Sequence, residues 1–394
     1  MTASLYIHVP FCASICDYCD FYSLAVPPGS SILKSYVDQI LKDAKELFGK
    51  LNVKYIPTVY IGGGTPSVLG ASLISGLLRD LSGDIWGKNT PMEITLEANP
   101  ESCDEDFLSS CRDSGISRIS LGLQSFHEPS RQAVQRAGEA GLLEERLKAV
   151  SMIYPQNFSV DIISGLPFQD ENILHRDIEK LLAFNPAHVS LYSLSIGPET
   201  PLGRRVTGGQ VKVPSEDEAD SLWIKGRDIL ESCGYKQYEV SNFSLPRKES
   251  LHNLRYWRME NWLGLGPAAS GTIINDEAKT GLRFTVPADI DLWLDRKNQK
   301  DPPGSMENLD TLTLIKDTFL MGFRLLEGPE ASLFQHRFNR GIEETIPRTI
   351  RAWRDKGLFQ EDKIALTKAG LLLLNTFLVE AFQELDETLV VSSP

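Results

Sequence analysis

The first half of the chain alternates short apolar runs with amphipathic stretches. From residue 4 to about residue 196, the apolar runs read SLYIHVP, PTVYIGGG, MEITLEANP, ISRISLGLQSF, FSVDIISGLP and HVSLYSLSIGP. Between them, apolar residues recur at helical spacing over 30–51 and about 71–82, 104–114, 130–153 and 171–184, which predicts one helix in each segment. Strands that alternate with helices in this way are typical of βα units around a parallel sheet, so we predict an α/β fold.

Polar residues in this region fall at or just past the predicted strand ends. Residues 62–65 follow the second strand, and Glu97, Gln124 and Asp161 lie near the ends of later ones. The carboxyl ends of parallel strands share one edge of a sheet, where ligands bind. We therefore expect these residues to form one site with the cysteine-containing loop that follows the first strand.

The last part of the chain has a different pattern. YKQYEVSNFS predicts one further strand, and HNLRYW and the glycine-rich WLGLGPAASG follow it. From about residue 301 the pattern is helical over 312–323 and 371–382, and KGLFQEDKIALTKAG predicts a short hairpin. These features predict two domains, 1–300 and 301–394, of which the second is small, helical and winged-helix-like.

The charge of the chain argues against a nucleic-acid partner. Lys and Arg number 40 and Asp and Glu number 53, which gives a net charge of −13. Residues 301–394 carry 10 basic and 15 acidic side chains, so the winged-helix pattern lacks the positive charge that phosphate backbones require. The chain shows neither a signal-peptide pattern nor an apolar run long enough to span a membrane. We therefore expect a cytoplasmic protein without an integral membrane segment.

Three of the six cysteines stand close together. Cys12, Cys16 and Cys19 have the spacing C-x3-C-x2-C, whereas the other three are scattered and are assigned no chemistry. Closely spaced thiols in a long chain are typical of a metal site rather than of a disulfide scaffold.

Three interpretations of this spacing compete. A structural zinc site takes four protein ligands, and a second cysteine pair is missing here. Coincidence is disfavoured because the three cysteines fall within eight positions. A 4Fe-4S cluster held by three thiolates leaves one iron open to an exogenous molecule, which would account for the missing fourth ligand.

The spacing, with Tyr18 directly before the last cysteine, resembles the motif of the radical S-adenosylmethionine (SAM) enzymes. The resemblance implies a partial (β/α)6 barrel and a 4Fe-4S cluster on Cys12, Cys16 and Cys19. It also implies that SAM binds the open iron and that a reduced electron donor supplies the electron for its cleavage. GGGTP at 62–66 fits this family, since glycines let a backbone approach the charged end of a ligand.

The resemblance narrows to one group of these enzymes. YIHVPFC, YIGGGTPS, LEANPE, SLGLQSF, VDIISGLPFQ and HNLRYW together resemble the group that contains oxygen-independent coproporphyrinogen III oxidase and the haem chaperone HemW. The SAM-binding positions of that group correspond here to Tyr6, Tyr18, Gly63, Gly64, Thr65, Glu97, Gln124, Arg136, Asp161 and Ser195, and several of these contact a second SAM in the oxidase. For Glu97 and Asp161 a structural alternative is a buried ion pair with Arg118 or Arg136.

HNLRYW matches a motif associated with haem binding in HemW. The resemblance implies that His252, Tyr256 and Trp257 contact haem, since imidazole binds iron and the two flat rings suit a porphyrin face. The alternative for His252 is a hydrogen-bonded packing residue.

Three features favour HemW over the oxidase. The oxidase pattern continues with a fourth cysteine where this chain has Phe21, Cys12 lies close to the first residue, and HNLRYW is present. The resemblance therefore implies haem binding and delivery to acceptor haemoproteins. The alternative is the oxidase reaction, a radical oxidative decarboxylation of two propionates of coproporphyrinogen III.

Overall fold

Six parallel strands form the centre of the molecule. The computed structural model describes residues 1–83, 90–295 and 304–391. The central strands are β1 (Ser4–Val9), β4 (Thr58–Gly63), β5 (Glu93–Ala98), β6 (Arg118–Gln124), β7 (Phe158–Ser164) and β8 (His188–Ser193), hydrogen-bonded in this order. Each strand lies within one of the predicted runs, so the predicted α/β architecture is confirmed.

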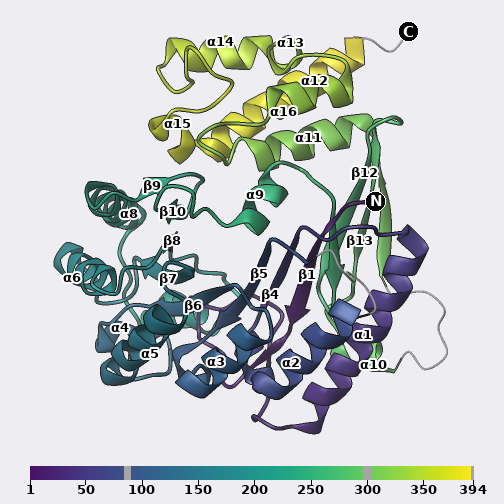
Figure 1. The fold of residues 1–394 in the computed structure, drawn as a ribbon. Helices are drawn as coiled ribbons and strands as arrows, with labels where there is room; N and C mark the ends of the chain where they lie inside the picture. The colour runs from purple at the N-terminus through teal and green to yellow at the C-terminus, as the bar shows by residue number, and fades with distance from the viewer. Residues whose placement is uncertain (84–89, 296–303, 392–394) are drawn as a thin grey trace.

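Helices cover the outer face of these strands (Figure 1). They are α1 (Ser31–Leu51), α2 (Gly70–Leu81), α3 (Glu105–Asp113), α4 (Glu128–Ala133), α5 (Ala140–Ile153) and α6 (Glu171–Leu182). In α1 the buried side chains Leu33, Val37 and Ile40 recur at three- or four-residue steps, which is why the sequence pattern finds this helix. Later in the chain, α7 (Pro201–Thr207) and α8 (Glu216–Ser232) follow β8, and α10 (Ile290–Leu294) packs against α1.

The single helix predicted over 130–153 is wrong, because the chain leaves the helix after Ala133. Gln135 and Gly138 have φ angles of 52° and 93°, and a left-handed backbone cannot continue a right-handed helix. Residues 134–139 therefore form a loop between α4 and α5, and this loop carries Arg136.

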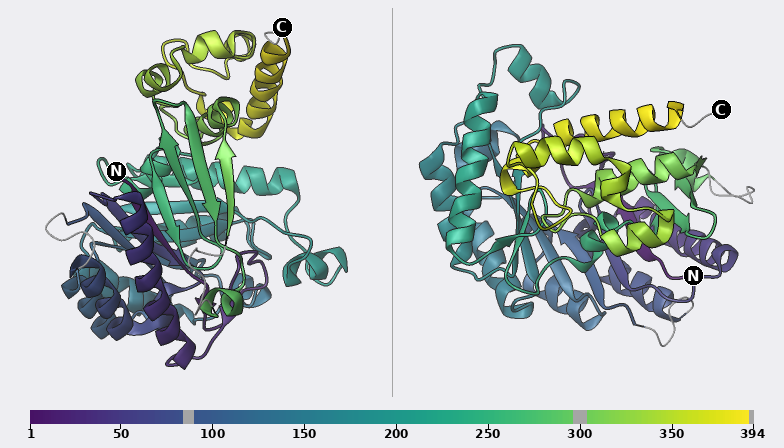
Figure 2. Two further views of the ribbon diagram at one scale, coloured as in Figure 1. Left: turned by 90° about the vertical axis from the view of Figure 1, so that its right-hand side faces the viewer. Right: turned by 90° about the horizontal axis from the view of Figure 1, so that it is seen from above.

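The barrel stays open because both edges of the six strands pair with other strands. β11 (Trp262–Leu265) lies parallel to β1, and the sheet continues through β12 (Ser270–Asn275), β13 (Thr280–Thr285) and β14 (Ser305–Leu309). Figure 2 (left) shows these green strands rising from the barrel toward the C-terminal helices. They extend the parallel sheet well beyond the six predicted strands.

At the other edge of the six strands, beside β8, the prediction of a single further strand is wrong. The segment YKQYEVSNFS forms two short antiparallel strands, β9 (Lys236–Gln237) and β10 (Asn242–Ser244), and β10 pairs with β8. The Glu239 carboxylate accepts a hydrogen bond from the Ser241 amide at 3.0 Å, within the turn that separates the two strands.

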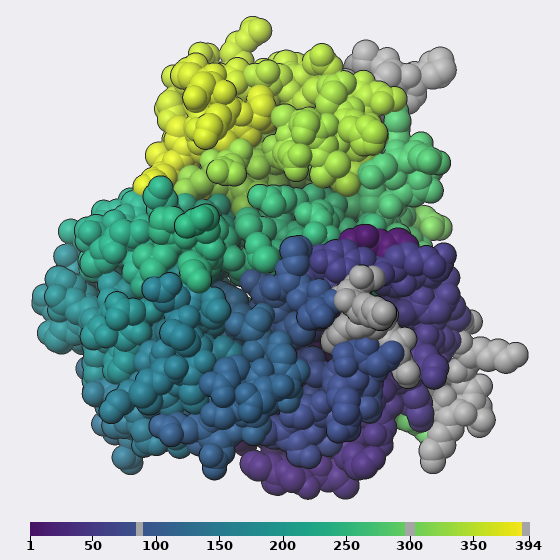
Figure 3. Space-filling view, in the orientation of Figure 1, coloured from purple at the N-terminus to yellow at the C-terminus, as the bar shows by residue number. Residues whose placement is uncertain are grey.

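The C-terminal region consists of helices packed around aromatic side chains. They are α11 (Thr311–Gly322), α12 (Ala331–Phe338), α13 (Ile342–Thr345), α14 (Pro347–Asp355), α15 (Lys368–Leu372) and α16 (Leu374–Val391). The predicted hairpin is reduced to one antiparallel bridge between Phe359 and Leu366. The predicted domain boundary at residues 300 and 301 lies outside the described residues. Figure 3 shows the C-terminal helices resting on the segments that precede them.

One short helix, α9 (Leu251–Trp257), lies between the barrel and the C-terminal helices (Figure 1). It packs against β4 and α11, and the amides of Leu251 and His252 donate to the carboxylate of Glu93, the first residue of β5. The amino ends of the barrel strands therefore face the C-terminal helices, and the carboxyl ends lie at the far end of the barrel. None of the helices described in the structure is long and apolar enough to cross a membrane.

Candidate cofactor site

A cavity of about 420 Å³ opens at the carboxyl ends of the barrel strands. All of the residues that the sequence assigns to the cluster and to SAM line it: Tyr6, Cys12, Cys16, Tyr18, Cys19, Gly63, Gly64, Thr65, Glu97, Gln124, Arg136, Asp161 and Ser195. They come from the first strand, from the cysteine loop and from the ends of the later strands, so the expected convergence on one site is found.

Main-chain hydrogen bonds hold the cysteine loop in place. Cys12 ends the short strand β2 (Phe11–Cys12), which pairs with β3 (Leu24–Ala25) and closes the loop between them. The Cys19 amide donates to the Cys16 carbonyl at 3.1 Å, which turns the chain between the second and third thiols. All three cysteines are free, so their sulfur atoms are available as ligands.

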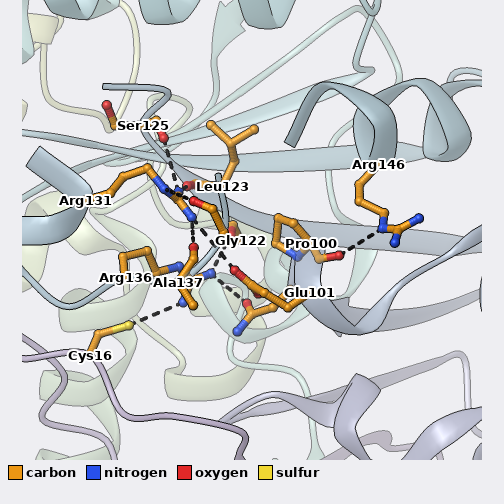
Figure 4. A network of polar contacts seen from close by, with 12 residues as sticks. Cys16, Pro100, Glu101, Gly122, Leu123, Ser125, Arg131, Arg136, Ala137 and Arg146 are labelled. Atoms are coloured by element: carbon orange, nitrogen blue, oxygen red, sulfur yellow. Dashed lines mark hydrogen bonds and ion pairs between the residues drawn. The ribbon is translucent and has the colours of Figure 1, made fainter. Parts of the chain in front are cut away.

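Side chains from the barrel and from the 134–139 loop donate to two of the three sulfur atoms. Thr65 Oγ1 donates to Cys12 Sγ at 3.4 Å. Arg136 Nη1 donates to Cys16 Sγ at 3.5 Å (Figure 4). Burial raises the pKa of the Cys12 thiol, although the hydrogen bond from Thr65 opposes this effect, and burial also raises the pKa of Cys19. A metal centre favours the thiolate form, so it would offset the cost of burying these charges.

The glycines after β4 let the cysteine loop approach the barrel. Gly63 has a φ of 117°, and a Cβ atom there would lie 2.8 Å from the imidazole of His8. A Cβ atom on Gly64 would lie 2.8 Å from the Phe11 carbonyl oxygen and 3.0 Å from Cys12 Sγ. Any larger residue at position 64 would therefore push the first cysteine out of place.

Two of the carboxylates that line the cavity, those of Glu97 and Asp161, accept hydrogen bonds from the protein. Glu97 accepts hydrogen bonds from the Tyr60 hydroxyl at 2.7 Å and from the Gly63 amide at 3.0 Å. Burial raises the pKa of the Glu97 carboxyl to about 7, and burial also raises the pKa of Asp161. The charge of Arg118 lowers both pKa values, but less than burial raises them. Both groups therefore favour a cationic or hydrogen-bonding ligand.

Arg131 fixes the loop that carries Arg136 (Figure 4). Its guanidinium, which is 2% exposed, donates to the carbonyls of Leu123 and Ser125 at the end of β6. The same group donates to the carbonyls of Ala137 and Gly138 in the loop. These bonds tie the 134–139 loop to the strand end, so the side chain of Arg136 is aimed into the cavity.

Two polar atoms at the cavity have no hydrogen-bond partner among the described residues. They are Oε1 of Gln124 and Nε of Arg136, and both are buried. Gln124 has a φ of 71° where β6 shifts its register against β7, and such strained positions are typical of functional sites. One acceptor and one donor are thus available to a polar ligand.

The HNLRYW residues lie at the opposite end of the barrel and do not line this cavity. The His252 side chain is 1% exposed, and its Nδ1 lies 2.9 Å from Thr58 Oγ1. Its Nε2 has no partner in the described part of the chain, and burial lowers the pKa of the imidazole to about 3. The guanidinium of Arg324 lies over the Trp257 ring at 4.9 Å. His252 is therefore packed into the interior with a neutral imidazole, whereas the other residues of the motif are half-buried.

Sequence reasoning missed several residues that shape the site. Tyr60 lies within YIGGG and Asn99 within LEANPE, two motifs that carry the family resemblance. Asn99 Nδ2 donates to Thr65 Oγ1 at 2.9 Å, and Arg136 donates to Asn99 Oδ1 at 2.7 Å. No periodicity marks Tyr60 or Asn99, since their partners lie 34 to 37 residues away in the sequence. The partners of Arg131 lie only six to eight residues away, but hydrogen bonds from a side chain to main-chain carbonyls leave no periodic pattern.

Comparison with known proteins agrees with this geometry. The model of the radical SAM superfamily matches residues 6–181. The protein named "Heme chaperone HemW" from Buchnera aphidicola subsp. Schizaphis graminum is 32% identical over 391 residues, covering 95% of this chain and 97% of that protein. Its namesake from Escherichia coli is 30% identical over 390 residues, with 95% and 97% covered.

A mitochondrial relative and a solved structure extend the comparison. "Radical S-adenosyl methionine domain-containing protein 1, mitochondrial" from Bos taurus is 33% identical over 407 residues, covering 98% of this chain and 88% of that protein. The structure of coproporphyrinogen III oxidase (HemN) from Escherichia coli superposes with a TM-score of 0.80 over 96% of this chain and 90% of that one, at 19% identity, which shows a common fold. The chain belongs to the radical SAM superfamily and, within it, to the HemW family.

Proposed function

We propose that this protein is a haem chaperone that binds haem and delivers it to acceptor haemoproteins. Membership of the radical SAM superfamily implies a 4Fe-4S cluster and SAM. The observation that carries the proposal is the similarity to HemW over 95% of the chain. A cytoplasmic location and a reduced electron donor remain parts of the proposal.

The cavity residues fit the two implied cofactors. Cys12, Cys16 and Cys19 would hold the cluster, and the donors from Thr65 and Arg136 would stabilise two of the thiolates. The free Oε1 of Gln124 and the Glu97 carboxylate suit an amine or ribose hydroxyls, and the free Nε of Arg136 suits a carboxylate. Bound together, the cluster and SAM supply one-electron chemistry.

The chain's own residues would orient SAM and shield the site from water. Gly63 and Gly64 present backbone without side chains to the ligand, and Tyr18 and Ser195 close the wall of the cavity. Binding of more than one SAM per chain in equilibrium dialysis would identify a second SAM site.

Nε2 of His252 has no hydrogen-bond partner in the described part of the chain, which supports a role for this imidazole as a ligand that would hold haem iron. Because the imidazole is 1% exposed, α9 has to shift away from the barrel before the ring can reach a porphyrin. Tyr256 and Trp257 lie on the same helix and would then offer flat apolar surfaces to the macrocycle.

The test combines haem binding with porphyrin turnover. The anaerobically reconstituted protein is titrated with haem, and haem transfer to apomyoglobin is followed by absorbance. We expect His252→Ala to weaken haem binding at least tenfold. His188→Ala is the matched control, because His188 is also 1% exposed but both of its ring nitrogens have partners, Ser159 and Tyr238.

Two outcomes contradict the proposal. Equal effects of the two substitutions on haem affinity would remove His252 from the haem site. Sustained conversion of coproporphyrinogen III to protoporphyrinogen IX by the reduced, SAM-loaded protein would instead identify the oxidase. Iron and sulfide analysis of the same sample decides between the cluster and the zinc alternative, since a 4Fe-4S cluster gives about four of each per chain.

A further inference from the structure

Tyr60 connects the two ends of the barrel. Its hydroxyl donates to Glu97 Oε1 at 2.7 Å, at the edge of the cofactor cavity. Its ring packs against the imidazole of His252, with centroids 5.2 Å apart and planes at 34°. The side chain of Tyr60 thus contacts both Glu97 of the proposed SAM site and His252 of the proposed haem motif.

The imidazole of His252 is held in this position from several sides. Thr58 Oγ1 lies 2.9 Å from Nδ1, and the ring of Tyr256 meets the imidazole edge-on at 4.8 Å. The His252 amide also donates to Glu93 at 3.0 Å. Nε2 is enclosed and has no partner among the residues that the structure describes, so any movement that brings this atom to an iron must lift the imidazole off the ring of Tyr60.

We propose that Tyr60 couples the two sites, so that haem and SAM oppose each other's binding. The inference rests on the proposed function, because it requires haem at His252 and SAM at Glu97. In one state His252 packs on Tyr60, and the Tyr60 hydroxyl bonds Glu97. In the other state His252 binds haem, and Tyr60 loses the packing that orients its hydroxyl.

The direction of the coupling follows from the donors to Glu97. A carboxylate surrounded by protein stays ionised in proportion to the hydrogen bonds that it accepts, and Glu97 has two, from Tyr60 and Gly63. When the bond from Tyr60 weakens, Glu97 attracts a cationic ligand less strongly, so bound haem weakens SAM binding. Reciprocity of binding free energies requires that SAM weaken haem binding by the same factor. SAM thereby promotes release of haem to an acceptor.

The coupling is measured as a pair of dissociation constants on the reconstituted, full-length protein. The affinity for SAM is determined by equilibrium dialysis with and without saturating haem, and the affinity for haem with and without SAM. We expect each ligand to weaken the binding of the other roughly 5- to 150-fold, the usual range of such couplings. The wild-type protein alone tests this expectation, so the result does not depend on the folding of any variant.

Two variants then assign the coupling to one hydroxyl. Tyr60→Phe keeps the ring that packs on His252 but removes the bond to Glu97, so the coupling factor should fall to within twofold of unity. Tyr154→Phe is the matched control, because this buried tyrosine donates to the Leu108 carbonyl outside the barrel. The control should retain the wild-type coupling factor.

The failures of the two proposals are distinguishable. Haem that binds through His252 but leaves the affinity for SAM unchanged, or increases it, overturns the coupling and leaves the chaperone function standing. A coupling factor that survives in Tyr60→Phe overturns the role of Tyr60. A protein whose haem affinity is unaffected by His252→Ala refutes the haem site itself, and the coupling with it.

Discussion

Replacing Glu97 with Gln should stabilise the cofactor-free protein while weakening its binding of SAM. Burial raises the pKa of the Glu97 carboxyl from 4.5 to about 7. The folded state therefore binds this proton more tightly than the unfolded chain does. The resulting penalty to stability is absent below about pH 4.5, grows as the pH rises toward 7 and is complete above about pH 7.

The size of the effect follows from these values. A pKa raised from 4.5 to about 7 corresponds to roughly 3 kcal/mol of destabilisation when the folded carboxyl is ionised. Gln removes the charge, but its side-chain carbonyl accepts only one of the hydrogen bonds from Tyr60 and Gly63, which costs about 1 kcal/mol. The variant should therefore be more stable by about 2 kcal/mol at pH 8, and the difference should shrink to nearly zero by about pH 5.

Urea unfolding of the cluster-free protein, followed by tryptophan fluorescence between pH 5 and pH 8, measures this difference. A variant that is less stable than the wild type at pH 8, or a difference that does not change with pH, would refute the reasoning. The affinity for SAM provides the functional counterpart. With a pKa of about 7, the ionised fraction of Glu97 falls roughly tenfold from pH 8 to pH 6. The affinity of the wild-type protein for SAM should therefore fall about tenfold over this range, whereas the affinity of Glu97→Gln for SAM should lack this fall.

Two further substitutions test the cysteine environment and the C-terminal core. Arg136→Met removes a cation 3.5 Å from Cys16 Sγ. A charge at such a distance is worth roughly 1 to 5 kcal/mol, depending on the effective dielectric constant. The midpoint potential of the cluster in an EPR-monitored titration should therefore fall by roughly 50 to 200 mV, and an unchanged potential would exclude this effect. Phe377→Ala removes a fully buried ring whose centroid lies 4.6 Å from that of Phe323 and 5.1 Å from that of Trp353. It should cost about 3–5 kcal/mol in thermal unfolding without loss of cluster iron, and a cost below about 1 kcal/mol would mean that the core refills the space.

The sequence by itself determined the strands and most of the helices of the barrel, because their periodicity is local. It also determined many of the side chains that meet in the cavity, although not Asn99. Parallel strands place their carboxyl ends at one edge, so residues such as Gly64, Glu97 and Asp161 converge once the strand pattern is known. The spacing of the cysteines needed no tertiary information, since all three lie on one loop.

Only the tertiary structure decided the features that periodicity does not encode. The break between α4 and α5 is stabilised by the bonds of Arg131 to carbonyls of β6 and of the following loop. These partners lie only seven or eight residues away, but helical periodicity does not register such side-chain bonds. Strands β11 to β14 extend the sheet through pairing that runs from β1, more than 250 residues earlier in the chain, out to β14.

The position of the HNLRYW motif in the fold also depends on tertiary contacts. The amide of His252 bonds the carboxylate of Glu93, 159 residues away, and this contact seats α9 at the amino ends of the strands. The same docking places His252 against Tyr60 and away from the cysteines. A sequence motif specifies which groups are present, but the packing of distant elements decides which end of the barrel they occupy and which side chains connect them.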